Sequence, residues 1–163
     1  MSFVVRPFEP DDAEWLLAAH QAAILAAEPY SRAVRESWAH GLTAEGYRQV
    51  YRSRERCVVG VAGGRAVGFC SFAGDTICGL YVHPDHQGMG LGRALLAAAE
   101  SDLAEQGATS LRVQASLTAR PFYARMGYAA AEPVEIATRG GLPLAAMVAE
   151  PFATLTDPAE HGR

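Results

Sequence analysis

Three glycines at alternate positions are the feature of this sequence that most suggests chemistry. Gly88, Gly90 and Gly92 lie in the stretch 87–92, which reads QGMGLG, and an alanine- and leucine-rich segment follows. Glycines have no Cβ atom, so they permit unusual backbone angles and let a ligand approach the backbone N–H groups. A helix that begins here would add unpaired N–H groups and about half a positive charge. The pattern predicts a phosphate-binding turn.

The surroundings of the turn narrow the kind of phosphate ligand. A dinucleotide fingerprint has glycines at relative positions one, three and six; Gly88 and Gly90 fit, but Arg93 occupies the sixth position. A Walker A loop requires a lysine, and the chain contains none. Neither nucleotide site fits. Arg93, in the first helical turn, offers a charge-assisted hydrogen bond to a phosphate. The alternative interpretation is a tight corner that binds nothing.

Histidines and cysteines offer weaker candidates. His83 and His86 flank a Pro-Asp pair, but no third ligand stands at a suitable spacing, so no metal site is predicted. Cys57, Cys70 and Cys78 lie in apolar runs without CxxC spacing. We expect reduced, buried thiols in a cytoplasmic protein.

Composition excludes several kinds of partner. The 163 residues are 50% hydrophobic and 20% charged, with a net charge of −4, and all 14 basic residues are arginine. An acidic chain is a poor ligand for nucleic acid. The N-terminus lacks the pattern of a signal peptide, and no apolar run is long enough to span a bilayer, so no membrane partner is expected. We predict one domain over residues 1–151 and a poorly ordered tail at 152–163.

Hydrophobic periodicity and turn residues predict the elements that position the glycine turn. Strands are expected at residues 3–6, 57–62, 66–72, 75–82, 111–115, 128–138 and 142–149. Helices are expected at residues 10–27 and 43–52, from the glycine turn to residue 107, and at 118–126. Segment 30–41 is ambiguous, with a four-residue period that suits a short helix. The expected order is β-α-α-β-β-β-α-β-α-β-β.

The connections between these elements predict the fold class. Gly63-Gly64 and Gly140-Gly141 are signals for hairpins, which pair strands antiparallel. The strand–helix–strand unit over 75–115 gives one parallel crossover. The expected fold is therefore α/β (α+β), with a mixed, mostly antiparallel central sheet flanked by helices.

A second motif lies downstream of the glycine turn. Segment 116–128 reads SLTARPFYARMGY. It resembles the Asn-x-x-Ala-x-x-Phe-Tyr-x-x-x-Gly-Phe/Tyr segment of the GNAT superfamily of N-acetyltransferases, with Ser116 in place of the usual asparagine. Segment 87–92 is similar to the Gln/Arg-x-x-Gly-x-Gly/Ala signature of the same family. Both motifs stand in the family's order and separation, and the resemblance covers essentially the whole chain.

The resemblance implies acetyl-CoA as the acetyl donor and a bulged strand before the turn that splays from its neighbour. The backbones of Leu80 and Val82 would hydrogen-bond the pantetheine and the thioester carbonyl, and residues 87–93 would hold the pyrophosphate. Plain core packing is the alternative role for Leu80 and Val82, and it is compatible with backbone contacts. The cofactor-binding positions implied by the resemblance are Leu80, Tyr81, Val82, Gln87, Gly88, Met89, Gly90, Leu91, Gly92, Arg93, Ser116, Ala119 and Phe122.

Acetyl transfer needs a neutral amine, a stabilised oxyanion and a proton for the departing thiolate. By resemblance, Tyr123 stands where the family's general acid usually lies; the alternative is a packing aromatic residue. Many relatives place a glutamate near the start of the strand before the turn, where this chain has Thr76. Asp75 is adjacent but is expected to point to the opposite face. The base is unassigned, with a water relay or a carboxylate from elsewhere left open.

The resulting hypothesis is acetylation of a primary amine on a small molecule, by direct attack in a ternary complex and without a metal. The alternatives are acetylation of a protein or peptide, and a non-catalytic sensor that binds acyl-CoA. The two intact motifs favour catalysis. The absence of a carboxylate at position 76, where this chain has Thr76, favours the sensor. A homodimer is left open. By resemblance, the segment that walls the acceptor site in this family contains Trp15, Trp38, Tyr30 and Tyr47. Core packing is the default interpretation for the two tryptophans.

Overall fold

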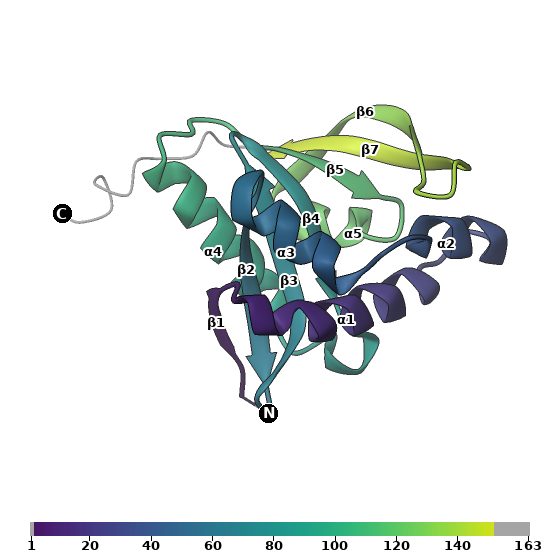
Figure 1. The fold of residues 1–163 in the computed structure, drawn as a ribbon. Coiled ribbons are helices and arrows are strands. Elements are labelled where there is room, and N and C mark those ends of the chain that lie inside the picture. Colours follow the sequence, from purple (N-terminus) through teal and green to yellow (C-terminus); the bar gives the residue numbers. More distant parts are fainter. Residues whose placement is uncertain (1, 152–163) are drawn as a thin grey trace.

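The computed structural model describes residues 2–151, which form a layered molecule around one seven-stranded sheet (Figure 1). The strands, which lie in the order β1-β2-β3-β4-β5-β7-β6, are β1 (Val4–Pro7), β2 (Arg56–Ala62), β3 (Arg65–Ala73), β4 (Thr76–Val82), β5 (Arg112–Ser116), β6 (Tyr128–Ala137) and β7 (Pro143–Pro151). The helices are α1 (Ala13–Leu25), α2 (Arg32–Ala39), α3 (Ala44–Ser53), α4 (Leu91–Glu105) and α5 (Arg120–Arg125), with 3-10 turns η1 (Pro10–Asp12) and η2 (Pro84–His86). The predicted tail at 152–163 lies outside the described residues.

The strand pairing confirms the predicted fold class. β4 and β5 are parallel, and the other paired strands are antiparallel. The ambiguous segment 30–41 forms α2, so three helices rather than two separate β1 from β2. Its start is fixed by a side-chain cap, because Ser31 Oγ accepts a hydrogen bond from the N–H of Val34.

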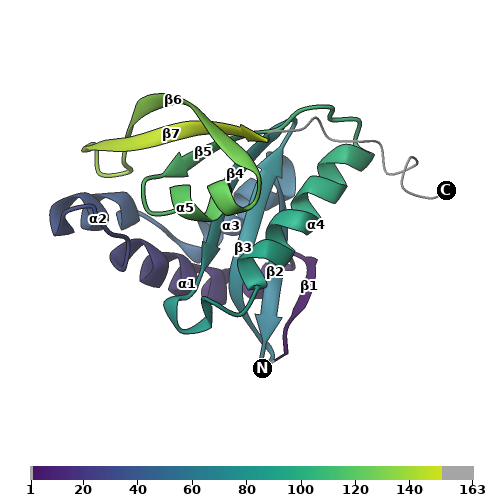
Figure 2. The same ribbon diagram turned by 180° about the vertical axis from the view of Figure 1, so that it is seen from behind.

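Helices cover both faces of the sheet. Figures 1 and 2 view the molecule from opposite sides, with α1 and α3 over one face and α4 over the other. Alternation along β3 sends Phe69 into the core beneath α1 and α3, and Cys70 into the core beneath α4. Within residues 2–151, no helix has both the length and the apolar character needed to cross a membrane.

The three cysteines do not share one environment. Cys57 and Cys70 are buried as predicted, but the prediction is wrong for Cys78, whose side chain is exposed. The reason is a bulge in β4. Ser71 pairs with Gly79 and Phe72 pairs with Ile77, so Cys78 is the extra residue between them.

Candidate active site

The sheet opens between β4 and β5. These strands pair at Thr76↔Arg112 and at Ile77↔Val113, and no further pairing joins them as β4 continues to Val82. Together with the bulge at Cys78, this confirms the expected bulged and splayed strand. Beyond Ile77, this edge of β4 leaves backbone N–H and C=O groups for a ligand to satisfy.

The glycine turn joins β4 to α4. Gly88 and Gly90 have φ values of +77° and +84°, which side-chain-bearing residues rarely adopt. Gly90 is the N-cap of α4 and supplies no side-chain hydrogen bond, so the first N–H groups of this helix are available to an anion. The turn is held by Gln87, whose Nε2 donates to the carbonyl of Val82 at 3.0 Å.

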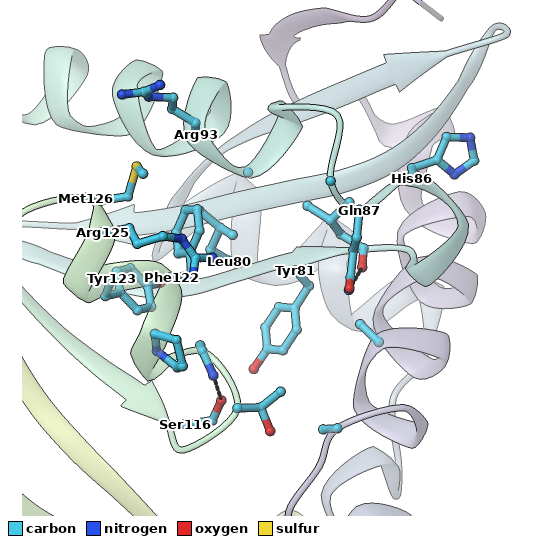
Figure 3. Close-up of a pocket in the computed structure, with 18 of the residues that line it drawn as sticks. Leu80, Tyr81, His86, Gln87, Arg93, Ser116, Phe122, Tyr123, Arg125 and Met126 are labelled. Atoms are coloured by element: carbon cyan, nitrogen blue, oxygen red, sulfur yellow. Dashed lines mark hydrogen bonds between the residues drawn. The ribbon is translucent and has the colours of Figure 1, made fainter.

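A cavity of about 530 Å³ lies along the splay and reaches the turn (Figure 3). It brings together eleven of the thirteen predicted cofactor positions, and Tyr123 as well: Leu80, Tyr81, Val82, Gln87, Gly88, Gly90, Gly92, Arg93, Ser116, Ala119, Phe122 and Tyr123. Met89 and Leu91 are not part of its lining. The side chain of Leu91 is 2% exposed and packs over Gly60, which leaves only its backbone for a cofactor.

We call this cavity the cofactor cleft. Several of the residues that line it were not among the predicted cofactor positions. They are Ala23, Ala27, Trp38, His86, Thr118, Pro121, Arg125 and Met126. Arg125 adds a second cation to Arg93 in the lining, and its place near the end of the short helix α5 carried no sequence signal. Ala23, Ala27 and Trp38 come from the segment around α1 and α2, which only tertiary packing brings to the cleft.

The α1–α2 segment is tied to the loop between β5 and α5. The N–H of Leu117 donates to the hydroxyl of Tyr30 at 2.7 Å, and the hydroxyl of Thr118 donates to the carbonyl of Glu28. Ser116 Oγ accepts from the N–H of Ala119 at 3.2 Å and so orders the start of α5. These bonds fix the α5 side of the cleft.

Tyr123 lies in α5 with only 4% of its side chain exposed, although it lines the cleft. Its ring packs edge-on against Phe122 and Tyr128, with centroid distances of 5.2 and 5.6 Å. Burial raises the pKa of Tyr123 well above its usual range. The phenol is therefore protonated at neutral pH and is a proton donor.

A second cavity, of about 260 Å³, lies on the α1–α3 face of β4. Trp38 and Tyr81 line both cavities, so the two spaces meet at these side chains. The other lining residues of this second cavity are His20, Gly41, Leu42, Thr43, Gly46, Tyr47, Val50, Tyr51, Glu55, Phe69, Ser71, Cys78, Gly79 and Arg139.

His20 is a buried polar residue in the lining of the second cavity. Its Nδ1 shares a hydrogen bond of 2.9 Å with the hydroxyl of Tyr47, and its ring stacks on Tyr81 with centroids 4.0 Å apart. Burial, with a smaller effect of the Arg139 charge, lowers the pKa of His20 to about 3. His20 is therefore neutral at physiological pH and too weak a base to hold a substrate proton.

Comparison with known proteins decides the family. The acetyltransferase (GNAT) domain family matches residues 20–150. A GCN5-related N-acetyltransferase from Rhodopseudomonas palustris is 32% identical, with a TM-score of 0.86 over 95% of this chain and 97% of that one. The chain belongs to the GNAT family of acetyltransferases. Among the curated proteins, none matches it closely enough to count as a relative.

Two more distant structures share the GNAT fold. The PaiA N-acetyltransferase from Thermoplasma acidophilum, in complex with coenzyme A, is 19% identical with a TM-score of 0.75, over 93% of this chain and 99% of that one. The yncA protein from Salmonella typhimurium, with its cofactor acetyl-CoA, is 18% identical with a TM-score of 0.72, over 92% and 93%.

The GNAT domain lacks a carboxylate at the expected base position. Thr76 donates its hydroxyl to the Asp75 carboxylate at 2.8 Å, so these side chains are in contact rather than on opposite faces. Neither residue lines either cavity. His83 Nδ1 accepts from the N–H of Asp85 and so orders the turn. Across residues 2–151, no group of three His, Cys, Asp or Glu side chains could hold a metal ion.

Proposed function

We propose that this GNAT acetyltransferase moves the acetyl group of acetyl-CoA to a primary amine of a small molecule. The observation that best supports this proposal is the cleft between the diverging strands β4 and β5. The start of α4, which has no side-chain cap, lies at the glycine turn of this cleft, and buried Tyr123 lies in its wall. The N–H groups of residues 88–92 would bind the pyrophosphate, and the unpaired edge of β4 would bind the pantetheine arm. Arg93 and Arg125 would contact phosphate oxygens.

The chemical step follows from these positions. The amine nitrogen forms a bond to the thioester carbon, and the carbonyl oxygen becomes an oxyanion near the backbone N–H groups of β4. Collapse of this intermediate breaks the C–S bond. The departing thiolate takes the proton of the Tyr123 phenol. The proton that the nitrogen loses as the amide forms passes to water, and the Tyr123 phenolate regains a proton from water.

Direct attack is favoured over an acetylated enzyme. The two cavities meet at Trp38 and Tyr81, so donor and acceptor can be bound at once on the two sides of β4. Of the three thiols, Cys78 lines the second cavity, and Cys57 and Cys70 line neither cavity. Partial burial and the neighbouring Glu55 carboxylate raise the pKa of Cys78 to about 11, so it is a poor nucleophile at neutral pH.

The second cavity suits a small acceptor. Its lining comes from α1, α2, α3, β3 and β4 and from Arg139 in the turn between β6 and β7. That turn is bound to α2, because Gly140 N–H donates to the carbonyl of Ser37 at 2.9 Å and the hydroxyls of Ser37 and Thr138 are 2.5 Å apart. Such a pocket admits a compact amine more readily than a polypeptide chain.

A screen of amines with acetyl-CoA, read out by release of the coenzyme A thiol, tests the proposal. We expect thiol release that requires a small primary amine and yields its N-acetyl derivative. Acetyl-CoA binding without transfer to any amine would instead identify a sensor. Transfer to peptides alone would identify a protein acetyltransferase.

A further inference from the structure

The second cavity carries two opposite charges. Among the described residues that line it, Glu55 supplies the one carboxylate and Arg139 the one guanidinium. Glu55 lies between α3 and β2, and Arg139 lies in the turn between β6 and β7. The other lining groups are aromatic, aliphatic or neutral polar at physiological pH. Such a lining is complementary to a molecule that carries both charges.

Arg139 is placed at the cavity by a well-anchored turn. Thr138 is 7% exposed, its N–H donates to the Leu142 carbonyl at 2.8 Å, and its hydroxyl accepts from the Leu142 N–H at 3.0 Å. The bonds from this turn to Ser37 fix it against α2. The backbone that carries Arg139 is therefore held in place before a ligand binds.

Among the side chains that the structure describes, which exclude those of residues 130–132 and 143–151, Arg139 has neither an ion pair nor a hydrogen bond. Arg6 and Arg48, by contrast, pair with Asp12 and Glu14. Its charge acts instead on the cavity wall: it adds to the effect of burial in lowering the pKa of His20, and it partly offsets the rise that burial causes in the pKa of Tyr81. An unpaired guanidinium beside aromatic rings is a strong and geometrically selective site for a carboxylate.

Glu55 reaches the cavity from the junction of α3 and β2, a different part of the lining from the β6–β7 turn that carries Arg139. The charge of its carboxylate helps to raise the pKa values of Tyr51, Cys57 and Cys78, and the charge of Arg139 contributes to none of these three shifts. Cys78 is the bulge residue of β4, and Gly79 next to it also lines the cavity. A substrate amine beside Glu55 would lie near the splayed edge of β4, where the thioester is proposed to bind.

From these positions we infer that the acceptor is an amine that also carries a carboxylate, as free amino acids do. Arg139 binds the carboxylate, the aromatic wall of Tyr47 and Tyr81 contacts the body of the molecule, and Glu55 lies beside the amine. An ammonium must lose a proton before it attacks. Glu55 accepts this proton: the N–H bond breaks, an O–H bond forms on the carboxylate, and the proton then passes to water. The inference deepens the proposed acetyl transfer and rests on it.

Matched acceptor pairs test the role of Arg139. The probes are α-, β- and γ-amino acids with an aromatic side chain, each compared with its primary amide, which removes the negative charge with little change of shape. Rates are compared per concentration of free amine, because the amide also lowers the pKa of the amine. For the wild type we expect kcat/KM to favour at least one acid over its amide by about tenfold or more. Arg139→Gln should abolish this preference by raising KM for the acid, while the constants for the amide stay unchanged. Arg32→Gln removes the same charge from the exposed face of α2 and should keep the preference.

Product binding separates this inference from the acetyl-transfer proposal. Calorimetry with the coenzyme A-saturated protein compares the N-acetyl acid with the N-acetyl amide, and needs no turnover. We expect tighter binding of the acid in the wild type and equal binding in Arg139→Gln. Equal binding of acid and amide to the wild type would overturn the inference even if amines are acetylated. Absence of acetylation with selective binding of the acid would overturn the transfer proposal alone.

Discussion

The rings of Trp38 and Tyr81 pack edge to face, with centroids 6.1 Å apart and an angle of 66° between the ring planes. This pair stands where the cofactor cleft and the second cavity meet. Burial raises the pKa of Tyr81 to about 12, so its phenol is neutral at physiological pH. These two neutral side chains therefore form the boundary between the cofactor cleft and the second cavity.

The glycine turn is tested by Gly90→Val. A β-branched residue is strained at φ +84° and places methyl groups where phosphate oxygens would contact the start of α4. We expect acetyl-CoA affinity to fall by more than tenfold, or about 1.4 kcal/mol, measured by calorimetry. Gly107→Val introduces comparable strain just after α4, at φ +95° and far from the cleft, and should leave affinity unchanged. Unchanged binding in a folded Gly90→Val protein would refute the phosphate site.

Tyr123→Phe tests the general acid. Removal of one buried hydroxyl keeps the ring packing against Phe122 and Tyr128 but takes away the proton for the thiolate. We expect kcat to fall by roughly 10²-fold with little change in acetyl-CoA affinity. Tyr128→Phe is the matched control, since it removes a neighbouring hydroxyl that has no hydrogen-bond partner among the described residues. If Tyr123→Phe turns over at the wild-type rate, Tyr123 is a packing residue only.

Glu55→Gln tests the proton acceptor through the pH dependence of kcat/KM. At neutral pH only about one alkyl amine in a thousand is the free base, because the amine pKa is about 10. We expect a loss of about 10²-fold near pH 7 that shrinks as the pH approaches the pKa of the amine. Burial raises the pKa values of neighbouring Tyr51 and Cys57, so these groups stay neutral and do not produce the effect.

The control for this experiment is Glu45→Gln, on the same helix–loop segment but outside the lining of both cavities. It should leave the pH profile unchanged. A loss in Glu55→Gln of equal size at every pH would show a structural effect, and would assign proton removal to another route.

The two cavities differ in how far the sequence predicts them. The cofactor cleft is largely predictable, because Gly88, Gly90 and the first turn of α4 are neighbours in the chain and anion binding at a helix start is a local property. Family resemblance added the positions in β4 and α5. The motif does not predict where each side chain points. Leu91 belongs to the glycine turn in sequence, but its side chain packs over Gly60 instead of lining the cleft.

The second cavity could be predicted only in part: family resemblance pointed to Trp38 and Tyr47, which line it, but its other parts come from distant segments. Glu55 and Arg139 carry no motif, and only the packing of α3 and the β6–β7 turn around β4 brings them into one lining. The bulge at Cys78 likewise depends on pairing with β3, for which the sequence of β4 alone has no signal. The short helix α2 was ambiguous in sequence, yet it anchors the turn that carries Arg139.

Stability against acid depends on His20. This side chain is 7% exposed, and burial lowers its pKa to about 3, whereas in the unfolded chain it is about 6.5. Between these values the unfolded chain binds a proton that the folded protein does not, so the free energy of unfolding falls as the pH falls below about 6.5. The loss amounts to about 2 kcal/mol between pH 7 and pH 5. It adds to the effect of protonating paired carboxylates such as Asp12.

His20→Phe isolates this contribution, because phenylalanine fills a similar space beside Phe69 and Tyr81 and does not titrate. The variant loses the hydrogen bond to Tyr47, so its unfolding free energy at pH 7 should be lower than that of the wild type. Its decrease between pH 7 and pH 5 should nevertheless be smaller by about 2 kcal/mol, measured by urea unfolding at a series of pH values. Exposed His40 provides the control, and His40→Gln should keep the wild-type slope. Parallel curves for the wild type and His20→Phe would show that His20 takes up a proton in the folded state, in which case the wall of the second cavity is more open to water than its packing indicates.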